Sequence, residues 1–383
     1  GALTIVNGAA LIADVTVNGA AVFSGNVADS AESVANVTFN GSVSGDATLN
    51  LNGNAVYNGE DSNIFGGTYT DLTIANGGAF ASGTTTVNGT ASLSGTFTDE
   101  AESDITFNGN TAGDATVNFA GIATYTFADT VIYSGTYGTL NIEADASFNA
   151  AVTVDDAVIN AVLTGSADLV FTGTGVTGTG SLNMTSGKVT YQAGGNIIRG
   201  TYNDLTVEAD GVFASGETTI NGNAVFEAGI TDAEDSVITF NGSANSGEMT
   251  SIGSVIYTTD SVLSGSYNNL TVAGTLGAAE LTVNNLTNAE EGVLSGSGSL
   301  LINNMITNVT AVEGIDGAYL DLTYGETYAG EVLSGEFADL TVNGTLEDAE
   351  ITIHGVLNNI QKTTLAGEGS LYMMAGAAFG SNV

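Results

Sequence analysis

The stretch Gly200-Thr-Tyr202-Asn-Asp-Leu205-Thr-Val207 decides the fold, because near copies of it return along the whole chain. The leucines of these copies lie at positions 72, 140, 205, 270 and 340, so the copies follow one another at nearly even intervals. Leu3-Thr-Ile5 is a truncated copy that precedes Leu72 by a similar interval. A nearly fixed spacing over the whole chain is typical of an architecture built from stacked repeats.

A second phrase lies about halfway between these copies. It reads Val37-Thr-Phe39-Asn-Gly near the start of the chain and returns around Phe107, Phe171 and Phe240. Since no linker separates the copies, we expect one continuous domain over residues 1–383. Its repeat units, the last of them partial, are 3–71, 72–139, 140–204, 205–269, 270–339 and 340–383.

Between the phrases, short runs alternate apolar and polar residues and end at Gly or Asn-Gly. Val15-Thr-Val17-Asn-Gly and Thr219-Ile220-Asn-Gly are examples. A period of two indicates β-strands with one buried face. Asn-Gly is also a hairpin signature, but antiparallel hairpins give no reason to repeat a whole phrase. The sequence therefore predicts an all-β protein, a single parallel β-solenoid (β-helix) of the right-handed type, with about 17 coils of about 22 residues in units of about 67 residues.

The expected core of this solenoid is a narrow one. Its inward side chains would be Leu, Ile, Val, Ala and Phe, stacked in columns along the axis. We expect equivalent residues of the repeats to lie above one another, one or three coils apart. The asparagines of the Asn-Gly turns are expected to stack as amide ladders, as they do in cross-β structures.

The formal net charge is −39, from 42 acidic and three basic residues. Binding to nucleic acid or to an anionic membrane surface needs clustered basic residues, so both partners are excluded. No run approaches the length of apolar sequence that a transmembrane helix needs, and we expect no membrane insertion. A hydrophobic content of 43% argues against disorder. The near absence of lysine, together with the type of repeat, favours a secreted chain.

The phrase Gly-Thr-Tyr-Asn-Asp-Leu-Thr-Val, followed by strands of small residues that end in Asn-Gly, resembles the repetitive β-helix of bacterial surface adhesins and exoproteins. Autotransporter passenger domains and filamentous-haemagglutinin-like proteins are the family types it is most similar to. The resemblance is architectural and covers nearly the whole chain. It implies an extracellular location at the cell surface, and it assigns no catalytic residue to this sequence.

Few residues of the chain have the chemistry that catalysis needs. His354 is the only histidine, and it occupies a turn position where other copies have Asn. Nucleophilic triads need a histidine next to Ser or Cys, and glycoside hydrolases need a close pair of carboxylates. The basic residues Lys188, Arg199 and Lys362 are too scattered to hold an acidic sugar. We therefore expect no enzymatic activity, no catalytic residue and no cofactor-binding residue.

Three acidic loops precede the phrases around Phe39, Phe107 and Phe240. We expect them to project from one edge of the solenoid, where their oxygen atoms would suit Ca²⁺. Their spacing matches neither an EF-hand nor the glycine-rich nonapeptide repeat, and the simpler interpretation is a solvated charged edge that resists aggregation. The candidate metal ligands are Asp29, Glu32, Asp99, Glu102, Asp232 and Asp235.

The chain opens in repeat register and closes on an apolar, strand-like stretch, without the polar caps of an isolated solenoid. Strand pairing between such ends is head-to-tail and generates a filament. We therefore expect an extracellular structural protein, the subunit of a self-assembling surface filament or sheath, whose partners are copies of itself. The candidate self-assembly residues are Leu3, Ile5, Tyr372, Met373, Met374 and Phe379.

An adhesin is the alternative function. In that case the solenoid would be a stalk or passenger domain that binds a host cell, another surface protein or a glycan. The irregular segment 305–331, with Tyr319, Tyr324 and Tyr328, interrupts the repeat and is the candidate binding insertion.

Overall fold

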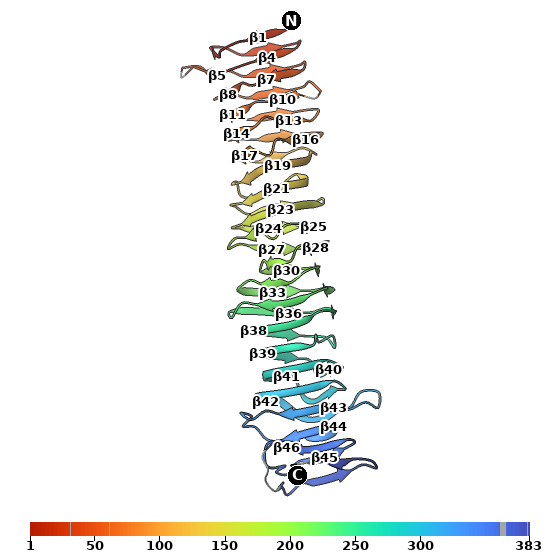
Figure 1. Ribbon diagram of the computed structural model, residues 1–383. Coiled ribbons are helices and arrows are strands. Elements are labelled where there is room, and N and C mark those ends of the chain that lie inside the picture. Colours follow the sequence, from red (N-terminus) through yellow and green to blue (C-terminus); the bar gives the residue numbers. More distant parts are fainter. Residues whose placement is uncertain (31, 61, 361–364, 381) are drawn as a thin grey trace. The chain divides into compact units, whose positions relative to one another are not determined.

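The computed structural model describes residues 1–30, 32–60, 62–360, 365–380 and 382–383, and these residues contain no helix. The chain forms two compact units, 1–198 and 199–383. Within each unit, short strands wind into coils, and the strands of successive coils pair in parallel (Figure 1). The prediction of an all-β parallel β-solenoid is confirmed.

The strands of unit 1 are β1 (Leu3–Ile5), β2 (Ala9–Leu11), β3 (Val15–Val17), β4 (Ala21–Phe23), β5 (Asn26–Asp29), β6 (Val37–Phe39), β7 (Val43–Gly45), β8 (Thr48–Asn50), β9 (Ala55–Tyr57), β10 (Ser62–Ile64), β11 (Gly66–Tyr69), β12 (Leu72–Ile74), β13 (Gly78–Phe80), β14 (Gly83–Val87), β15 (Ala91–Leu93), β16 (Thr96–Asp99), β17 (Ser103–Phe107), β18 (Thr111–Ala112), β19 (Thr116–Tyr125), β20 (Thr130–Val131), β21 (Ser134–Ile142), β22 (Ala146–Phe148), β23 (Val152–Ile159), β24 (Val162–Gly165), β25 (Leu169–Phe171), β26 (Val176–Thr177), β27 (Ser181–Met184), β28 (Lys188–Tyr191) and β29 (Gly195–Ile197).

The strands of unit 2 are β30 (Gly200–Tyr202), β31 (Asp204–Val207), β32 (Gly211–Phe213), β33 (Gly216–Ile220), β34 (Ala224–Phe226), β35 (Gly229–Asp232), β36 (Ser236–Phe240), β37 (Ala244–Asn245), β38 (Glu248–Tyr257), β39 (Gly265–Val272), β40 (Thr275–Gly277), β41 (Glu280–Gly296), β42 (Ser299–Glu313), β43 (Leu320–Tyr324), β44 (Ser334–Val342), β45 (Glu350–Ile353), β46 (Val356–Asn359), β47 (Ser370–Met373) and β48 (Ala378–Phe379).

The coils are shorter and more numerous than the sequence indicated. The described residues make about 21 turns, with stacked coils about 18 residues apart. The strand register gives a similar coil length, since Leu3 pairs with Ala21 and Ala123 pairs with Leu140. A regular coil consists of three short strands, as in β13, β14 and β15, so a short strand and a tight turn suffice for each side. The expected coil length was therefore wrong.

The sequence repeat and the coil are out of phase. In unit 1 the successive partners of Gly67, the glycine of one Gly-Thr-Tyr copy, are Thr85, Ile105, Ala123 and Leu140. Leu140 belongs to the later half of strand β21 in the next copy, whereas the equivalent Gly135, earlier in the same strand, lies in another column, opposite Val117. One repeat thus spans a non-integral number of coils, between three and four, and each copy is shifted by one face. The expectation that equivalent residues stack directly is wrong.

Alternation along the strands separates the core from the surface. In β14, β17 and β19 every second side chain is buried, and the residues between them are exposed or half-buried. The inward residues include the predicted Leu, Ile, Val, Ala and Phe. The core also contains a residue type that the sequence analysis left out, since eight of its largest fully buried side chains are tyrosines.

These tyrosines form the same packing and hydrogen-bonding arrangement in several repeats. Phe107 packs on Tyr125 of the next coil, with 4.9 Å between ring centroids. The hydroxyl of Tyr125 then lies 3.1 Å from that of Tyr137, which donates to the carbonyl of Tyr133 at 2.6 Å. The same arrangement occurs with Phe39, Tyr57 and Tyr69, and with Phe240, Tyr257 and Tyr267. The hydroxyls are thereby hydrogen-bonded inside an apolar core, which removes the cost of burying them unpaired.

The predicted asparagine ladders are confirmed. The amide of Asn40 donates to the side-chain oxygen of Asn18 at 2.7 Å, and the amide of Asn58 donates to Asn40 at 2.9 Å. Asn241 donates to Asn221 in the same way at 3.0 Å. Each ladder follows a corner of the solenoid, where the Asn-Gly turn brings one amide above the next.

The glycine of the Gly-Ser-Tyr copy in unit 2 is required by a close approach of two strands. Gly265 has φ of 145°, and a Cβ there would lie 1.9 Å from the carbonyl oxygen of Met249. Gly292 has nearly the same φ, 143°, but open space around it. We expect Gly292→Ala to cost about 1–3 kcal/mol from backbone strain alone.

Gly265→Ala adds a collision to the same strain, so it should lower the urea midpoint further than Gly292→Ala does. Equal midpoints for the two variants, measured by far-ultraviolet circular dichroism, would contradict the close packing of these coils.

Burial raises the pKa of Tyr125, Tyr137 and their counterparts, because the core cannot solvate a phenolate. Their stabilising effect is complete below the unfolded-state pKa of about 10 and is lost as the pH rises above it. We expect phenolate absorbance and loss of β-structure to appear together in an alkaline titration. Ionisation of all tyrosines near an ordinary tyrosine pKa, with an unchanged circular dichroism spectrum, would show that they are not buried.

Candidate functional site

The first aspartate of each predicted acidic loop is engaged with the protein itself. In unit 2, Asp232 is only 5% exposed. Its carboxylate accepts hydrogen bonds from the hydroxyls of Ser236 at 2.6 Å and Ser251 at 2.8 Å, and from the backbone amide of Ile252 at 2.7 Å. The carboxylate therefore joins its own turn to the next coil.

In unit 1, Asp99 and Asp29 act in a similar way. Asp99 accepts from the hydroxyl of Ser103 and from the backbone amides of Ala120 and Gly121. Asp29 accepts from the backbone amide of Asn52 at 2.8 Å and from its side chain at 3.0 Å. The spacing Asp-x-x-x-Ser, which occurs at Asp29, Asp99 and Asp232, was the available sequence signal for this role.

The other candidate ligands, Glu32, Glu102 and Asp235, are exposed. Within the described ranges, no three or more His, Cys, Asp and Glu side chains gather closely enough to hold a metal ion. The loops of unit 1 also do not share an edge. Asp99 continues the column of Phe80, whereas Asp29 continues the column of Leu11, on another face.

His354 lies under an aromatic ring. The ring of Tyr319 stacks on it with 3.7 Å between centroids and 12° between planes. Its Nε2 atom is 3.4 Å from Oε2 of Glu336, close enough for an ion pair when the imidazole is protonated, but it makes no hydrogen bond. Of the basic residues, Lys188 is exposed and Lys362 lies outside the described residues.

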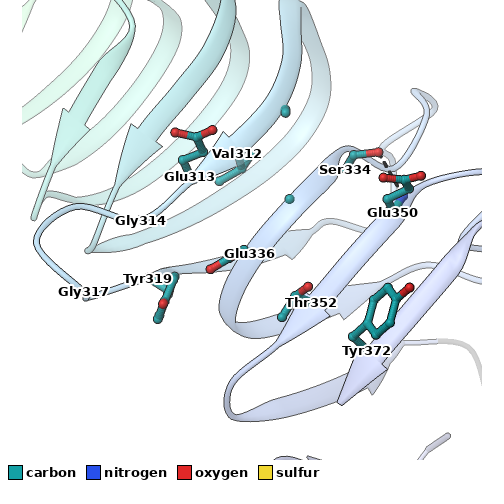
Figure 2. Close-up of a pocket in the computed structure, with 12 residues that line it drawn as sticks. Val312, Glu313, Gly314, Gly317, Tyr319, Ser334, Glu336, Glu350, Thr352 and Tyr372 are labelled. Carbon is teal, nitrogen blue, oxygen red and sulfur yellow. Dashed lines mark hydrogen bonds between the residues drawn. The ribbon is translucent and has the colours of Figure 1, made fainter. Parts of the chain in front are cut away.

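A groove of about 560 Å³ lies beside this stack, on the surface of unit 2. Figure 2 shows its floor on successive strands, with Glu336, Thr352 and Tyr372 side by side, and the loop from Gly314 to Gly317 at its border. Carboxylates of Glu313 and Glu350 also line it. The groove thus combines carboxylates with tyrosine rings, which pair with cations or with the faces of sugars.

A second groove of unit 2, of about 530 Å³, lies on the preceding repeat. Its lining includes Thr250, Ser266, Thr282 and Asn284, so hydroxyls and amides occupy positions equivalent to those of the first groove. Ser266 corresponds to Glu336, and Asn284 corresponds to His354. The lining of the second groove also includes Glu234, so it has one carboxylate where the first groove has three, Glu313, Glu336 and Glu350.

The candidate self-assembly residues lie on outer strands. Among the residues described, β1 pairs with β4 alone, and both Leu3 and Ile5 are half-buried. Strand β47 pairs with β45, and β48 pairs with β46. Exposed fractions are 63% for Tyr372, 47% for Met374 and 56% for Phe379, and Met373 is half-buried.

Comparisons with models of protein families, with curated proteins and with solved structures find no match to this chain. In the described part of the chain, no helix has the length and apolar character needed to cross a membrane.

The carboxylate of Asp232 should be a structural element. We expect Asp232→Ala to lower the free energy of unfolding by about 1–3 kcal/mol, because two buried hydroxyls and one part-buried backbone amide lose their acceptor. The exposed neighbour Asp235→Ala is the matched control and should leave the urea midpoint unchanged.

Calcium is added to the same titrations as a second variable. A rise in the midpoint of the wild-type chain with Ca²⁺ that Asp232→Ala abolishes would instead support metal binding at this loop.

Proposed function

We propose that the chain is an extracellular structural protein, the subunit of a surface filament or sheath, and that it has no catalytic role. The proposal is supported by strands β1 and β48, which within the described residues pair on one side only. Parallel coils leave backbone amides and carbonyls free on both outer faces of a stack, and such edges pair readily with further strands.

The repeat suggests how two copies would join. Within unit 1, Leu72-Thr-Ile74 lies between Ala55-Val-Tyr57 on one side and Ala91-Ser-Leu93 on the other. Leu3-Thr-Ile5 has the same sequence, but within the described residues it pairs on one side only, with Ala21-Val-Phe23. We propose that a strand of a second copy pairs with the other side of this strand. Phe379 is suited to this, since its column also contains Leu357 and Leu340.

Charge favours growth at the ends over lateral association. With 42 acidic and three basic residues, the flanks of two chains repel one another. The exposed side chains of the last strands are instead apolar or aromatic, namely Leu371, Tyr372, Met374 and Phe379. Burial of such surface contributes about 25 cal/mol for each Å² and would stabilise an end-to-end contact.

An adhesin stalk remains the second proposal. The specific observation in its favour is the acidic and aromatic groove on the flank of unit 2, which resembles a ligand site more than a packing defect. A stalk would present that groove laterally, and it would not require contacts between copies.

Electron microscopy of negatively stained protein, together with sedimentation velocity, tests the assembly. We expect unbranched filaments whose formation depends on protein concentration. Phe379→Asp should abolish them, because it places a charge in the new interface. Val237→Asp on the flank, where Val237 is 36% exposed, is the control and should leave filaments intact. Single particles at every concentration, for the wild-type chain as well, would refute the filament proposal.

A further inference from the structure

The segment between β42 and β43 contains a two-residue turn that is closed by its own backbone. The amide of Ile315 donates to the carbonyl of Ala318 at 2.8 Å, and the amide of Ala318 donates to the carbonyl of Ile315 at 2.9 Å. Asp316 and Gly317 lie between them, with φ of 54° and 80°. A type I′ hairpin turn requires positive φ at both central residues, and Asp-Gly is one of its preferred sequences.

Both residues at the tip of this turn are open to solvent. Asp316 and Gly317 are exposed, and a Cβ added to Gly317 would have no heavy atom within 4 Å. Figure 2 shows Gly314, Gly317 and Tyr319 on a loop that runs outside the strands. Within the described ranges, the carboxylate of Asp316 forms no hydrogen bond. Its side chain is therefore free to rotate toward the backbone nitrogen of Gly317.

The chain has a second Asp-Gly pair, Asp210-Gly211, whose surroundings differ. Asp210 is also exposed, but its carboxylate accepts a hydrogen bond at 3.1 Å from the backbone amide of Gly229 on the next coil. Gly211 is buried in strand β32, where it pairs with Ile230. The two pairs thus have the same chemistry and an equally exposed class of aspartate, but neighbouring coils hold the pair at 210 in place.

We infer that Asp316-Gly317 is a site of spontaneous isoaspartate formation, and that this modification separates Tyr319 from His354. The backbone nitrogen of Gly317 attacks Cγ of the protonated Asp316 carboxyl group. A C–N bond forms, and the hydroxyl of the carboxyl group leaves as water with the proton of the backbone amide, which gives a five-membered succinimide. Water then opens the ring. When it breaks the bond between the nitrogen and the original main-chain carbonyl carbon, the main chain continues through Cγ as isoaspartate.

Isoaspartate lengthens the main chain of the turn by one carbon atom. The two hydrogen bonds between Ile315 and Ala318 fit a link of two ordinary residues, so the longer link does not keep both of them. Ala318 leads directly to Tyr319, whose ring stacks on His354 with 3.7 Å between centroids. We expect this stack to open, which carries the change from the turn to the only histidine of the chain.

The test follows both Asp-Gly pairs in one sample. The folded chain is incubated in mildly acidic buffer, where part of the carboxyl groups is protonated, and isoaspartate is located by enzymatic methylation and peptide mapping. We expect it to accumulate about tenfold faster at position 316 than at position 210, because at position 210 at least one hydrogen bond must break first. In guanidinium chloride, where the coils are lost, the two positions should react at similar rates.

Gly317→Asn is the matched variant. Asn tolerates positive φ and therefore keeps the turn, but its side chain hinders the approach of the backbone nitrogen to Asp316. Isoaspartate formation at position 316 should fall several-fold. Proton nuclear magnetic resonance of the imidazole checks the second step, since His354 gives the only histidine signals. These signals should move in the aged wild-type chain to their positions in Tyr319→Ala, and should stay in place in the aged Gly317→Asn chain.

Three results would overturn the inference. Equal rates at positions 316 and 210 in the folded chain would mean that neighbouring coils give no protection. Isoaspartate at position 316 only after unfolding would mean that the turn holds the Asp316 side chain away from the nitrogen of Gly317. Complete isomerisation with unchanged imidazole signals would mean that Tyr319 stays on His354.

Discussion

Parallel pairing of each coil with the next is the constraint on which the rest of the structure depends. A strand spacing of about 4.8 Å leaves no room for side chains between backbones, so the inward residues of each coil must fit directly onto those of its neighbours. Gly265, where a Cβ would lie 1.9 Å from the carbonyl oxygen of Met249, is the direct result of this close approach. The same constraint explains why polar groups such as Asn40 and Asp232 bond to the coil before or after them.

The buried tyrosines show how the solenoid fills its core without losing hydrogen bonds. A coil of about 18 residues encloses a narrow interior, and large rings from adjacent coils occupy it in an offset arrangement. Each hydroxyl then needs a partner, and the Tyr125 and Tyr137 pair provides one. In the repeat 270–339, Phe337 replaces the second tyrosine, and the hydroxyl of Tyr324 instead accepts from the backbone amide of Leu333 at 2.9 Å. The requirement for a partner is thus met even where the sequence has diverged.

The fold was predictable from the sequence because alternation and turn residues act locally. The repeated phrase, the period of two and the Asn-Gly turns predict parallel coils and the ladders of Asn18, Asn40 and Asn58. The coil length was not predictable in this way. Since a repeat spans a non-integral number of coils, the sequence distance from Leu72 to Leu140 does not reveal how many turns lie between them.

For the same reason, the sequence does not show which candidate site residues share a face of the solenoid. Asp29 and Asp99 have similar sequence surroundings but different faces, and the acidic groove becomes visible only when Glu313 and Glu336 are placed on adjacent coils. The proposed roles of Leu3 and Phe379 stay predictions, because they concern contacts with other copies.

The coil register is tested most directly by disulfide cross-linking, for which the absence of native cysteine gives a clean background. Thr136 and Thr153 are outward partners on adjacent coils. The account predicts that cysteines at 136 and 153 form a disulfide on mild oxidation, with the circular dichroism spectrum unchanged. The longer coil that the sequence indicated would instead bring position 136 next to Val158. Cross-linking of cysteines at 136 and 158, but not of those at 136 and 153, would contradict the stacking described here.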